Sequence, residues 1–378
     1  MSVSLTPAER LKFALLADGL DISERAAAYL ADRNGGRALT PADYPSTSGV
    51  ILRLPDDVWV NAPIQAHNPN FVGRSGQVLD VDADRQLFVR YEGDEIPASF
   101  WIPPAYHDQS TDTDGWPTTD VAFTHGDRVR LSPISGCSMT CKFCDLPYTS
   151  RYRTKSVERI VDGLKVALSD PIQPAHHVLI SGGSPRATDV GYVRDVYSAV
   201  VDAAGPIPVD IMMVPMADLM DPAWLADIGV REVSVNLEIW DEATAGQLMI
   251  KKSMQGRRTY LDYLERATTK LGSGRVRSML MVGLDSIDDT LAGVDAIART
   301  GAVPVLSPFR PDPDTPLRDR RPPSATDLET VFLRARDLVD HLGVALGPSC
   351  IPCSHNTLTF ARDARHGSYH AFGEPVMV

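Results

Sequence analysis

Residues 136–144 read Gly-Cys-Ser-Met-Thr-Cys-Lys-Phe-Cys and hold three of the five cysteines of this 378-residue chain. Cys137, Cys141 and Cys144 have the spacing Cys-x3-Cys-x2-Cys. Three thiolates on a short loop can ligate three irons of a [4Fe–4S] cluster, and the fourth iron then has no protein ligand. An open coordination position lets a cluster do chemistry rather than only carry electrons. A structural zinc site is the weaker interpretation, because it needs four ligands and Asp145 is a poor substitute for a fourth cysteine.

The rest of the composition narrows the class of protein. The other two cysteines, Cys350 and Cys353, form a second group, and an odd total in two groups is a poor disulfide framework. The start of the chain lacks the features of a signal peptide, and no stretch is long and apolar enough to span a membrane. We therefore expect a cytoplasmic protein without a membrane partner. The net charge of −12 argues against nucleic-acid binding, which requires a basic surface.

Strand-like and helix-like segments alternate on both sides of the cysteine loop from about residue 126 onward. We expect strands at 128–133, 177–181, 209–214, 232–239, 276–282, 303–307 and 344–346, with helices at 157–168, 190–203, 222–228, 260–271, 288–299 and 325–342. This alternation predicts parallel βαβ units with right-handed connections. The fold class is therefore α/β, with a full or partial (βα) barrel. The cysteine loop follows the first strand, at the end of a barrel where active sites lie.

The first part of the chain has a different pattern. A helix is expected at 6–31, short strands at 50–54, 77–81 and 86–91, and a polar linker at 110–119. The predicted organisation is a smaller α+β accessory domain (1–125), the barrel (126–348) and a C-terminal tail with Cys-x2-Cys (349–378).

The three cysteines, with Phe143 directly before the last one, resemble the signature of the radical S-adenosylmethionine (SAM) superfamily. The resemblance implies a [4Fe–4S] cluster on Cys137, Cys141 and Cys144, with SAM on the open iron and Phe143 near the adenine. One electron from the cluster would cleave SAM to a 5′-deoxyadenosyl radical, which abstracts hydrogen from a substrate. The later motifs are closest in style to the biotin synthase-like group of this superfamily.

Two of these motifs follow the second and fourth expected strands. Gly182, Gly183 and Ser184 resemble the Gly-Gly-Glu segment that binds the SAM amino group, with serine in place of the acid; a plain turn between strand and helix is the alternative. Asn236 and Glu238 resemble an Asn-Leu-Asp stretch that contacts the SAM ribose, and a pair of satisfied core polar residues is the alternative.

The fifth and sixth strands give weaker matches. Val282 and Gly283 resemble part of an element whose backbone meets adenine, although its first glycine is missing here. Arg310 would reach the barrel mouth and pair with the SAM carboxylate or an anionic substrate. An ion pair with Asp312 or Asp314 is an equal alternative.

The pair Cys350 and Cys353 follows the last expected strand, so we expect it at the same mouth as the cluster. Four roles are open. The pair would ligate a second metal centre with His355 or Asn356, act as a catalytic thiol hydrogen donor, contribute to a zinc site, or form a disulfide or packing contact. By contrast, His176 and His177 precede the second strand and are expected to be structural.

The leading hypothesis is an enzyme that abstracts hydrogen from a small-molecule substrate, with flavodoxin or ferredoxin as the reductant. Whether it is an oxidoreductase, a transferase or a lyase is left open. Modification of a peptide or an RNA is the first alternative. A non-enzymatic iron–sulfur protein is the second, and Gly182, Gly183, Asn236 and Glu238 argue against it because such a protein needs no SAM pocket.

Overall fold

A computed structural model describes residues 4–40, 49–64, 67–68, 76–109, 115–363 and 373–378. Its central sheet has seven strands in the order β16-β15-β14-β13-β12-β9-β8. All neighbours pair in parallel except β8 and β9, which are antiparallel. The strands are β8 (Ala122–His125), β9 (Arg128–Leu131), β12 (His177–Ile180), β13 (Val209–Met212), β14 (Glu232–Ser234), β15 (Val276–Val282) and β16 (Val303–Pro308).

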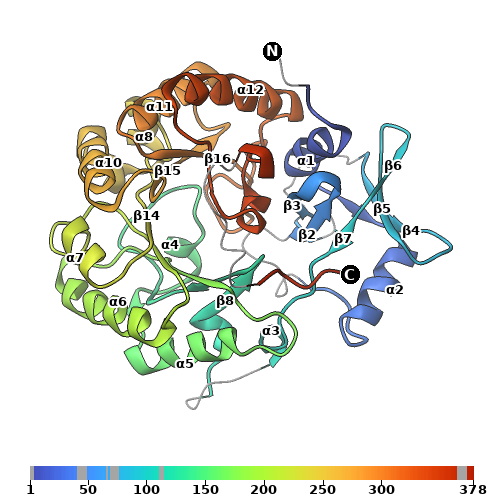
Figure 1. The fold of residues 1–378 in the computed structure, drawn as a ribbon, viewed down its shortest axis with the longest axis horizontal. Helices are drawn as coiled ribbons and strands as arrows, with labels where there is room; N and C mark the ends of the chain where they lie inside the picture. The colour runs from blue at the N-terminus through green and yellow to red at the C-terminus, as the bar shows by residue number, and fades with distance from the viewer. Residues whose placement is uncertain (1–3, 41–48, 65–66, 69–75, 110–114, 364–372) are drawn as a thin grey trace.

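Helices surround this sheet on its convex side. In Figure 1 they form an arc from α5 through α6, α7, α10 and α11 to α12, with the strands inside it. Their bounds are α5 (Val157–Leu168), α6 (Val190–Ala204), α7 (Pro222–Asp227), α10 (Arg257–Leu271), α11 (Ile287–Arg299) and α12 (Ala325–Leu342). Strand alternation separates the two faces: Val129 and Leu131 are fully buried in the apolar core, whereas Arg128 and Arg130, which alternate with them, face the barrel lumen. The predicted partial (βα) barrel is confirmed.

Short elements lie between the barrel strands and their helices. The cysteine loop is flanked by the antiparallel pair β10 and β11, and further short helices follow several strands. These elements are β10 (Ile134–Ser135), α4 (Leu146–Thr149), β11 (Arg153–Thr154), η4 (Ala187–Asp189), α8 (Glu242–Leu248), α9 (Ile250–Ser253), η5 (Pro352–Asn356) and η6 (Ala361–Asp363).

The N-terminal region forms two small sheets and two main helices, as the predicted α+β class requires. One sheet has the order β1-β4-β5-β6 and the other β3-β2-β7, and Figure 1 places both on the side of the barrel that the helical arc leaves open. The bounds are α1 (Pro7–Asp18), β1 (Asp21–Ile22), α2 (Glu24–Arg33), β2 (Gly49–Leu54), η2 (Pro55–Asp57), β3 (Val58–Pro63), β4 (Val78–Val81), β5 (Leu87–Tyr91), β6 (Asp94–Pro97), β7 (Ser99–Phe100), α3 (Tyr106–Gln109) and η3 (Thr118–Asp120).

Three expected elements differ from the structure. The expected helix at 6–31 is two helices, because Gly19 takes φ 77° after α1 and Ser23 caps α2. The expected strand at 232–239 ends as a regular strand at Ser234, and Glu238 takes φ 67°. The expected strand at 344–346 is not formed; only Gly347 bridges to Val305 of β16. Part of the expected linker, 110–114, lies outside the described residues.

The C-terminal segment closes the gap between the two edge strands of the barrel. Leu358 N–H donates to the Leu306 carbonyl of β16 at 2.9 Å. On the other edge, the His355 ring packs edge-on against His125 of β8. Lys12 of α1 holds this segment by donating to the carbonyls of Ser354 and Thr359, at 2.9 and 2.7 Å. Complete burial lowers the pKa of Lys12 to about 7.

None of the helices in the described part of the chain is both long and apolar enough to cross a lipid bilayer.

Candidate active site

The cysteine loop is fastened to the end of the second barrel strand. The Cys137 sulfur accepts hydrogen bonds from the N–H groups of Met139 and Ser184, at 3.3 and 3.2 Å. Ser138 N–H donates to the Ser184 carbonyl at 3.0 Å, and its hydroxyl donates to the Pro185 carbonyl at 2.9 Å. Two segments far apart in sequence are thus brought together where the parallel strands end.

The two glycines are required by close backbone approach at this junction. A Cβ on Gly183 would lie 1.7 Å from the Gly136 carbonyl oxygen, and a Cβ on Gly182 would lie 2.6 Å from the Ser132 hydroxyl. Gly182 also takes φ 124°, which other residues rarely adopt. The Gly-Gly sequence therefore allows the cysteine loop to pack directly on β12.

A cavity of about 440 Å³ lies over this junction, within the size range of small-molecule sites. It brings together most of the side chains selected from the sequence, which come from several strand ends. Its lining includes Cys137, Cys141, Phe143, Cys144, Gly182, Ser184, Asn236, Glu238 and Arg310.

Besides Cys350 and Cys353, three of the selected residues are not in the cavity wall. Gly183 packs behind it, against Gly136. The carbonyl of Val282 accepts a hydrogen bond from Phe309 N–H at 2.8 Å, and the carbonyl of Gly283 accepts one from Arg320 at 2.8 Å. An adenine contact by the backbone of Val282 or Gly283 therefore stays a prediction.

The donor set suits a cluster better than a single ion. Within the described residues, the three sulfurs are not among the ligand groups that lie within 4.8 Å of one another. A tetrahedral zinc ion with bonds of about 2.3 Å would need its sulfurs about 3.8 Å apart. Burial raises the pKa of Cys141 to about 12 and also raises the pKa of Cys144. Both free thiols are thus protonated at neutral pH and release protons when they bind metal.

Asn236 and Glu238 face the cavity from the irregular end of the fourth strand. The Asn236 side-chain oxygen accepts from the Ser234 hydroxyl at 2.7 Å and from Met279 N–H at 3.2 Å. Glu238 forms a largely buried ion pair with Lys252 at 2.7 Å. These contacts fix the side chains of Asn236 and Glu238 in the cavity wall.

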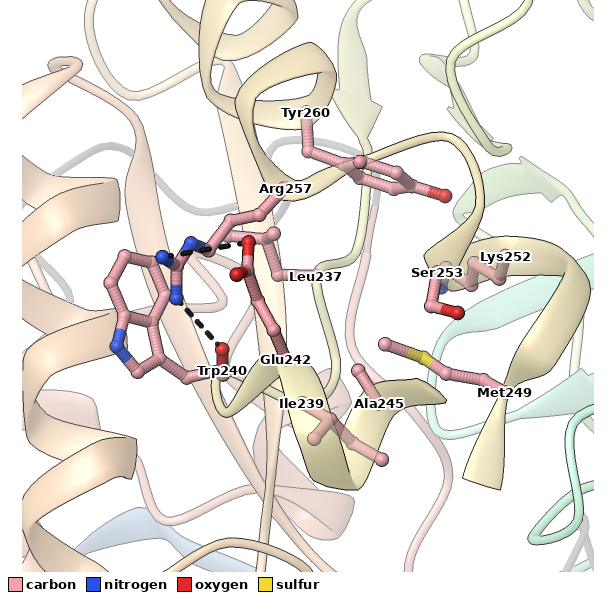
Figure 2. A pocket seen from close by; sticks show the side chains of 11 residues that line it. Leu237, Ile239, Trp240, Glu242, Ala245, Met249, Lys252, Ser253, Arg257 and Tyr260 are labelled. Carbon is pink, nitrogen blue, oxygen red and sulfur yellow. Dashed lines mark hydrogen bonds and ion pairs between the residues drawn. The ribbon is translucent and has the colours of Figure 1, made fainter. Parts of the chain in front are cut away.

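A smaller cavity of about 140 Å³ lies beside the main one, and Figure 2 shows its lining. The Arg257 guanidinium stacks on Trp240, with its carbon 4.1 Å from the ring centroid, and donates to the Trp240 carbonyl at 3.0 Å. Glu242 lies 3.6 Å from the same guanidinium. Trp240 lines this side cavity and not the main one, whereas Lys252 lines both.

A third cavity of about 290 Å³ occupies the barrel lumen below the cysteine loop. It adjoins the main cavity, because the two share the lining residues Arg130, Phe143, Met212, Met281 and Arg310. Arg310 donates to the Asn61 carbonyl at 3.2 Å and to the Asn356 side chain at 2.6 Å. Within the described residues it forms no ion pair with Asp312 or Asp314, the alternative drawn from the sequence. Burial lowers its pKa to about 10, so it remains charged at neutral pH.

The expected position of Cys350 and Cys353 was wrong. Both lie against Asp127, which directly precedes β9, and against His177, the first residue of β12. These are the N-terminal ends of the strands, opposite the cysteine loop. The expectation that loops after barrel strands lie at the C-terminal ends of the strands failed here, because no regular strand precedes this loop. The segment after residue 347 instead covers the N-terminal end of the barrel. His355 is not part of this group, since its ring bonds the Pro352 carbonyl at 2.5 Å.

Comparison with known proteins supports the fold and the cysteine loop. Residues 131–294 match the family described as the radical SAM superfamily. The chain contains a radical SAM domain. It is an enzyme domain that in this superfamily uses a [4Fe–4S] cluster and SAM, and the cysteine triad lies inside the matched region. Among curated proteins, none matches the sequence.

Several solved structures are similar in fold. They include the [FeFe]-hydrogenase maturase HydG from Carboxydothermus hydrogenoformans (14% identity, TM-score 0.49, 62% of this chain and 57% of that one). SuiB from Streptococcus suis, bound to the precursor peptide SuiA, has 14% identity and a TM-score of 0.46 over 62% and 51% of the two chains. A radical SAM methyltransferase from Sphaerobacter thermophilus has 14% identity and a TM-score of 0.45 over 74% and 78%. The chain thus spans little more than half the length of the HydG chain.

Proposed function

We propose that the chain cleaves SAM reductively and abstracts a hydrogen atom from a small molecule held in the barrel lumen. This proposal is based on the shared cavity at the strand ends. The cavity joins the cysteine triad to the residues that follow β12 and β14. When bound, the cluster supplies the electron that converts SAM to methionine and a 5′-deoxyadenosyl radical.

Each wall of the cavity has a distinct task in this proposal. Cys137, Cys141 and Cys144 hold the cluster as thiolates. Gly182 offers its backbone to the amino acid end of SAM, beside Ser184, whose backbone N–H and carbonyl hold the cysteine loop. Asn236 and Glu238 bind the ribose hydroxyls. Phe143 lines both the cofactor cavity and the lumen cavity and would separate adenine from the substrate.

The size of the lumen cavity supports a small substrate. A volume of about 290 Å³ below the cofactor cavity suits a metabolite-sized molecule and not a folded RNA or a long peptide. Enclosure within the barrel also protects a radical from water and side reactions. A small electron carrier such as flavodoxin or ferredoxin would supply the electron. A cytoplasmic location belongs to the proposal, because the unpaired cysteines need a reducing compartment.

The proposal is tested by reconstituting the protein anaerobically with iron and sulfide, adding dithionite and SAM, and measuring 5′-deoxyadenosine by liquid chromatography. We expect 5′-deoxyadenosine and methionine in equal amounts. A protein with a complete [4Fe–4S] spectrum that releases no 5′-deoxyadenosine would contradict the proposal. Exchange of deuterium from labelled candidate substrates into 5′-deoxyadenosine would then identify the hydrogen donor.

A further inference from the structure

Four metal-ligating side chains from three separate segments meet at the closed end of the barrel. We propose that Asp127, His177, Cys350 and Cys353 bind one Zn²⁺ ion that is distinct from the cluster. Asp127 precedes β9, His177 begins β12, and the two cysteines lie on the C-terminal segment. All four residues are buried, and their ligand atoms lie within 4.8 Å of one another.

The individual distances match a tetrahedral ion. The Asp127 oxygen Oδ1 lies 3.2 Å from the Cys350 sulfur, 3.6 Å from the Cys353 sulfur and 3.5 Å from His177 Nδ1. The Cys353 sulfur lies 3.5 Å from His177 Nε2. Zinc bonds of about 2.0–2.3 Å in tetrahedral geometry separate neighbouring ligand atoms by about 3.3–3.8 Å. Asp127 and Cys353 are near different nitrogens of the His177 ring, and only one nitrogen would bind the ion. Because each residue still offers one ligand atom within 4.8 Å of the others, one ion can sit within reach of all four.

The donor types select zinc over the cluster that the sequence left open for this pair. Two thiolates, one imidazole and one carboxylate give four ligands of the kinds that zinc prefers in closed structural sites. A second iron–sulfur cluster would need its ligands spread over two or more irons, whereas all four ligand atoms here lie within 4.8 Å of one another. The two cysteines would bind as thiolates, and their protons pass to solvent.

The position of the site suggests what the ion does. Cys353 lines the lumen cavity, so the ion would lie directly beneath the substrate chamber. Around it, Trp101 of the N-terminal region donates to the Gly126 carbonyl at 2.8 Å, and Ser349 bonds Glu232 at 3.1 Å. The zinc ion would fix the C-terminal segment to the first two barrel strands and so form the floor of the chamber.

Metal analysis of the full-length protein, purified aerobically without added zinc, tests the proposal. We expect close to one zinc per chain, and X-ray absorption at the zinc edge should show two sulfur ligands and two nitrogen or oxygen ligands. His177→Asn and Cys353→Ser should lose the zinc while the iron bound at the cysteine loop after reconstitution stays unchanged. His176→Asn is the matched control, because its neighbouring ring is outside the group of four, and it should keep the zinc.

Metal analysis of the wild-type protein tests the proposal even if these variants fold poorly. Absence of zinc, or zinc with four sulfur ligands, would overturn the proposal. So would iron and sulfide in excess of one [4Fe–4S] cluster per chain that depend on Cys353. None of these measurements requires turnover of SAM, so they are independent of the proposed reaction.

A different observation, the charge of the lumen, points to the substrate class and rests on the proposed function. We infer that the substrate carries a carboxylate or phosphate group. Four arginines line the lumen cavity, and its lining contains no acidic residue; they are Arg128, Arg130, Arg277 and Arg310.

Two of the four arginines, Arg128 and Arg130, have a guanidinium group that can bind an anionic ligand. Arg277 is held by Asp210 at 3.0 Å and by Glu232, and Arg310 is held by Asn61 and Asn356. Arg128 and Arg130 alternate on β9 and both face the lumen. The Nε atom of each is buried and has no hydrogen-bond partner among the described residues. Both side chains are half-buried at the cavity wall, and an anion in the cavity would accept hydrogen bonds from the exposed nitrogens of their guanidinium groups.

The arrangement also orients the substrate. Arg130 lines both cavities, whereas Arg128 lines only the lumen cavity and lies at the N-terminal end of β9. An anionic group at Arg128 would direct the other end of the substrate toward the SAM cavity. Replacing Arg128 should therefore weaken substrate binding and leave SAM binding unchanged.

Thermal unfolding of the protein without SAM, in inorganic phosphate, pyrophosphate or glutarate, tests this inference. We expect at least one of the three anions to raise the midpoint by several degrees, with less than half of that shift in Arg128→Gln. Arg334→Gln, an exposed position on α12, should keep the full shift. No shift with any of the anions, or an equal shift in Arg128→Gln, would overturn the inference. Release of 5′-deoxyadenosine by Arg128→Gln, measured separately, shows whether the SAM reaction itself has failed.

Discussion

Replacing Cys141 by alanine is expected to abolish both the iron–sulfur absorbance and the release of 5′-deoxyadenosine, to the level of a control without protein. The Cys141 sulfur packs beside Ile239, Leu248 and Phe309, whose apolar side chains offer no ligand in its place. With only Cys137 and Cys144 left, two of the four irons would lack a protein ligand, the open iron included. Iron analysis after reconstitution and the 5′-deoxyadenosine assay measure the two losses.

Ser138→Ala is the matched control in the same loop. Its hydroxyl bonds the Pro185 carbonyl, but it offers no cluster ligand, and its N–H contact with Ser184 survives the substitution. We expect it to keep its iron and most of its activity. Full 5′-deoxyadenosine release by Cys141→Ala would show that the cysteine triad is not the cluster site and would remove the basis of the proposed function.

The barrel could be predicted because the sequence pattern that indicates it lies within short stretches of the chain. The alternation of apolar strands and amphipathic helices after residue 126 is contained in short windows of sequence, and so is the cysteine spacing. The exceptions arose where one residue's backbone overrides the pattern. Gly19 divides the expected first helix, and Glu238, at φ 67°, ends the regular pairing of the fourth strand. Composition gives no sign of a positive φ at a glutamate.

The floor of the barrel could not be predicted, because its residues meet only in the folded chain. The sequence pattern predicts the correct strand end for His177 but the opposite end for Cys350 and Cys353. Their contacts with Asp127 and His177 join positions 176 to 226 residues apart, and no motif marks Asp127.

Gly183→Ala is expected to have the second largest effect, although it alters no ligand. The added Cβ would lie 1.7 Å from the Gly136 carbonyl oxygen, 2.8 Å from the Gly136 carbonyl carbon and 3.0 Å from Cys137 Cα. These neighbours are backbone atoms that cannot rotate away, so the cysteine loop must move by about 1 Å or more. A displacement of that size in a catalytic group can lower the rate by about 100-fold. We expect reduced iron content and a comparable loss of 5′-deoxyadenosine release.

Gly191→Ala separates this steric effect from the general cost of adding a methyl group. Gly191 lies in α6 with no atom within 4 Å of the position of its added Cβ. There alanine should stabilise the helix by up to about 1 kcal/mol and leave SAM cleavage unchanged. The midpoint of thermal unfolding and the 5′-deoxyadenosine yield distinguish the two variants. Wild-type iron content and activity in Gly183→Ala would mean that the cysteine loop does not rest on β12. The close Gly136–Gly183 contact would then have no part in holding the cluster, and the SAM cavity would need another support.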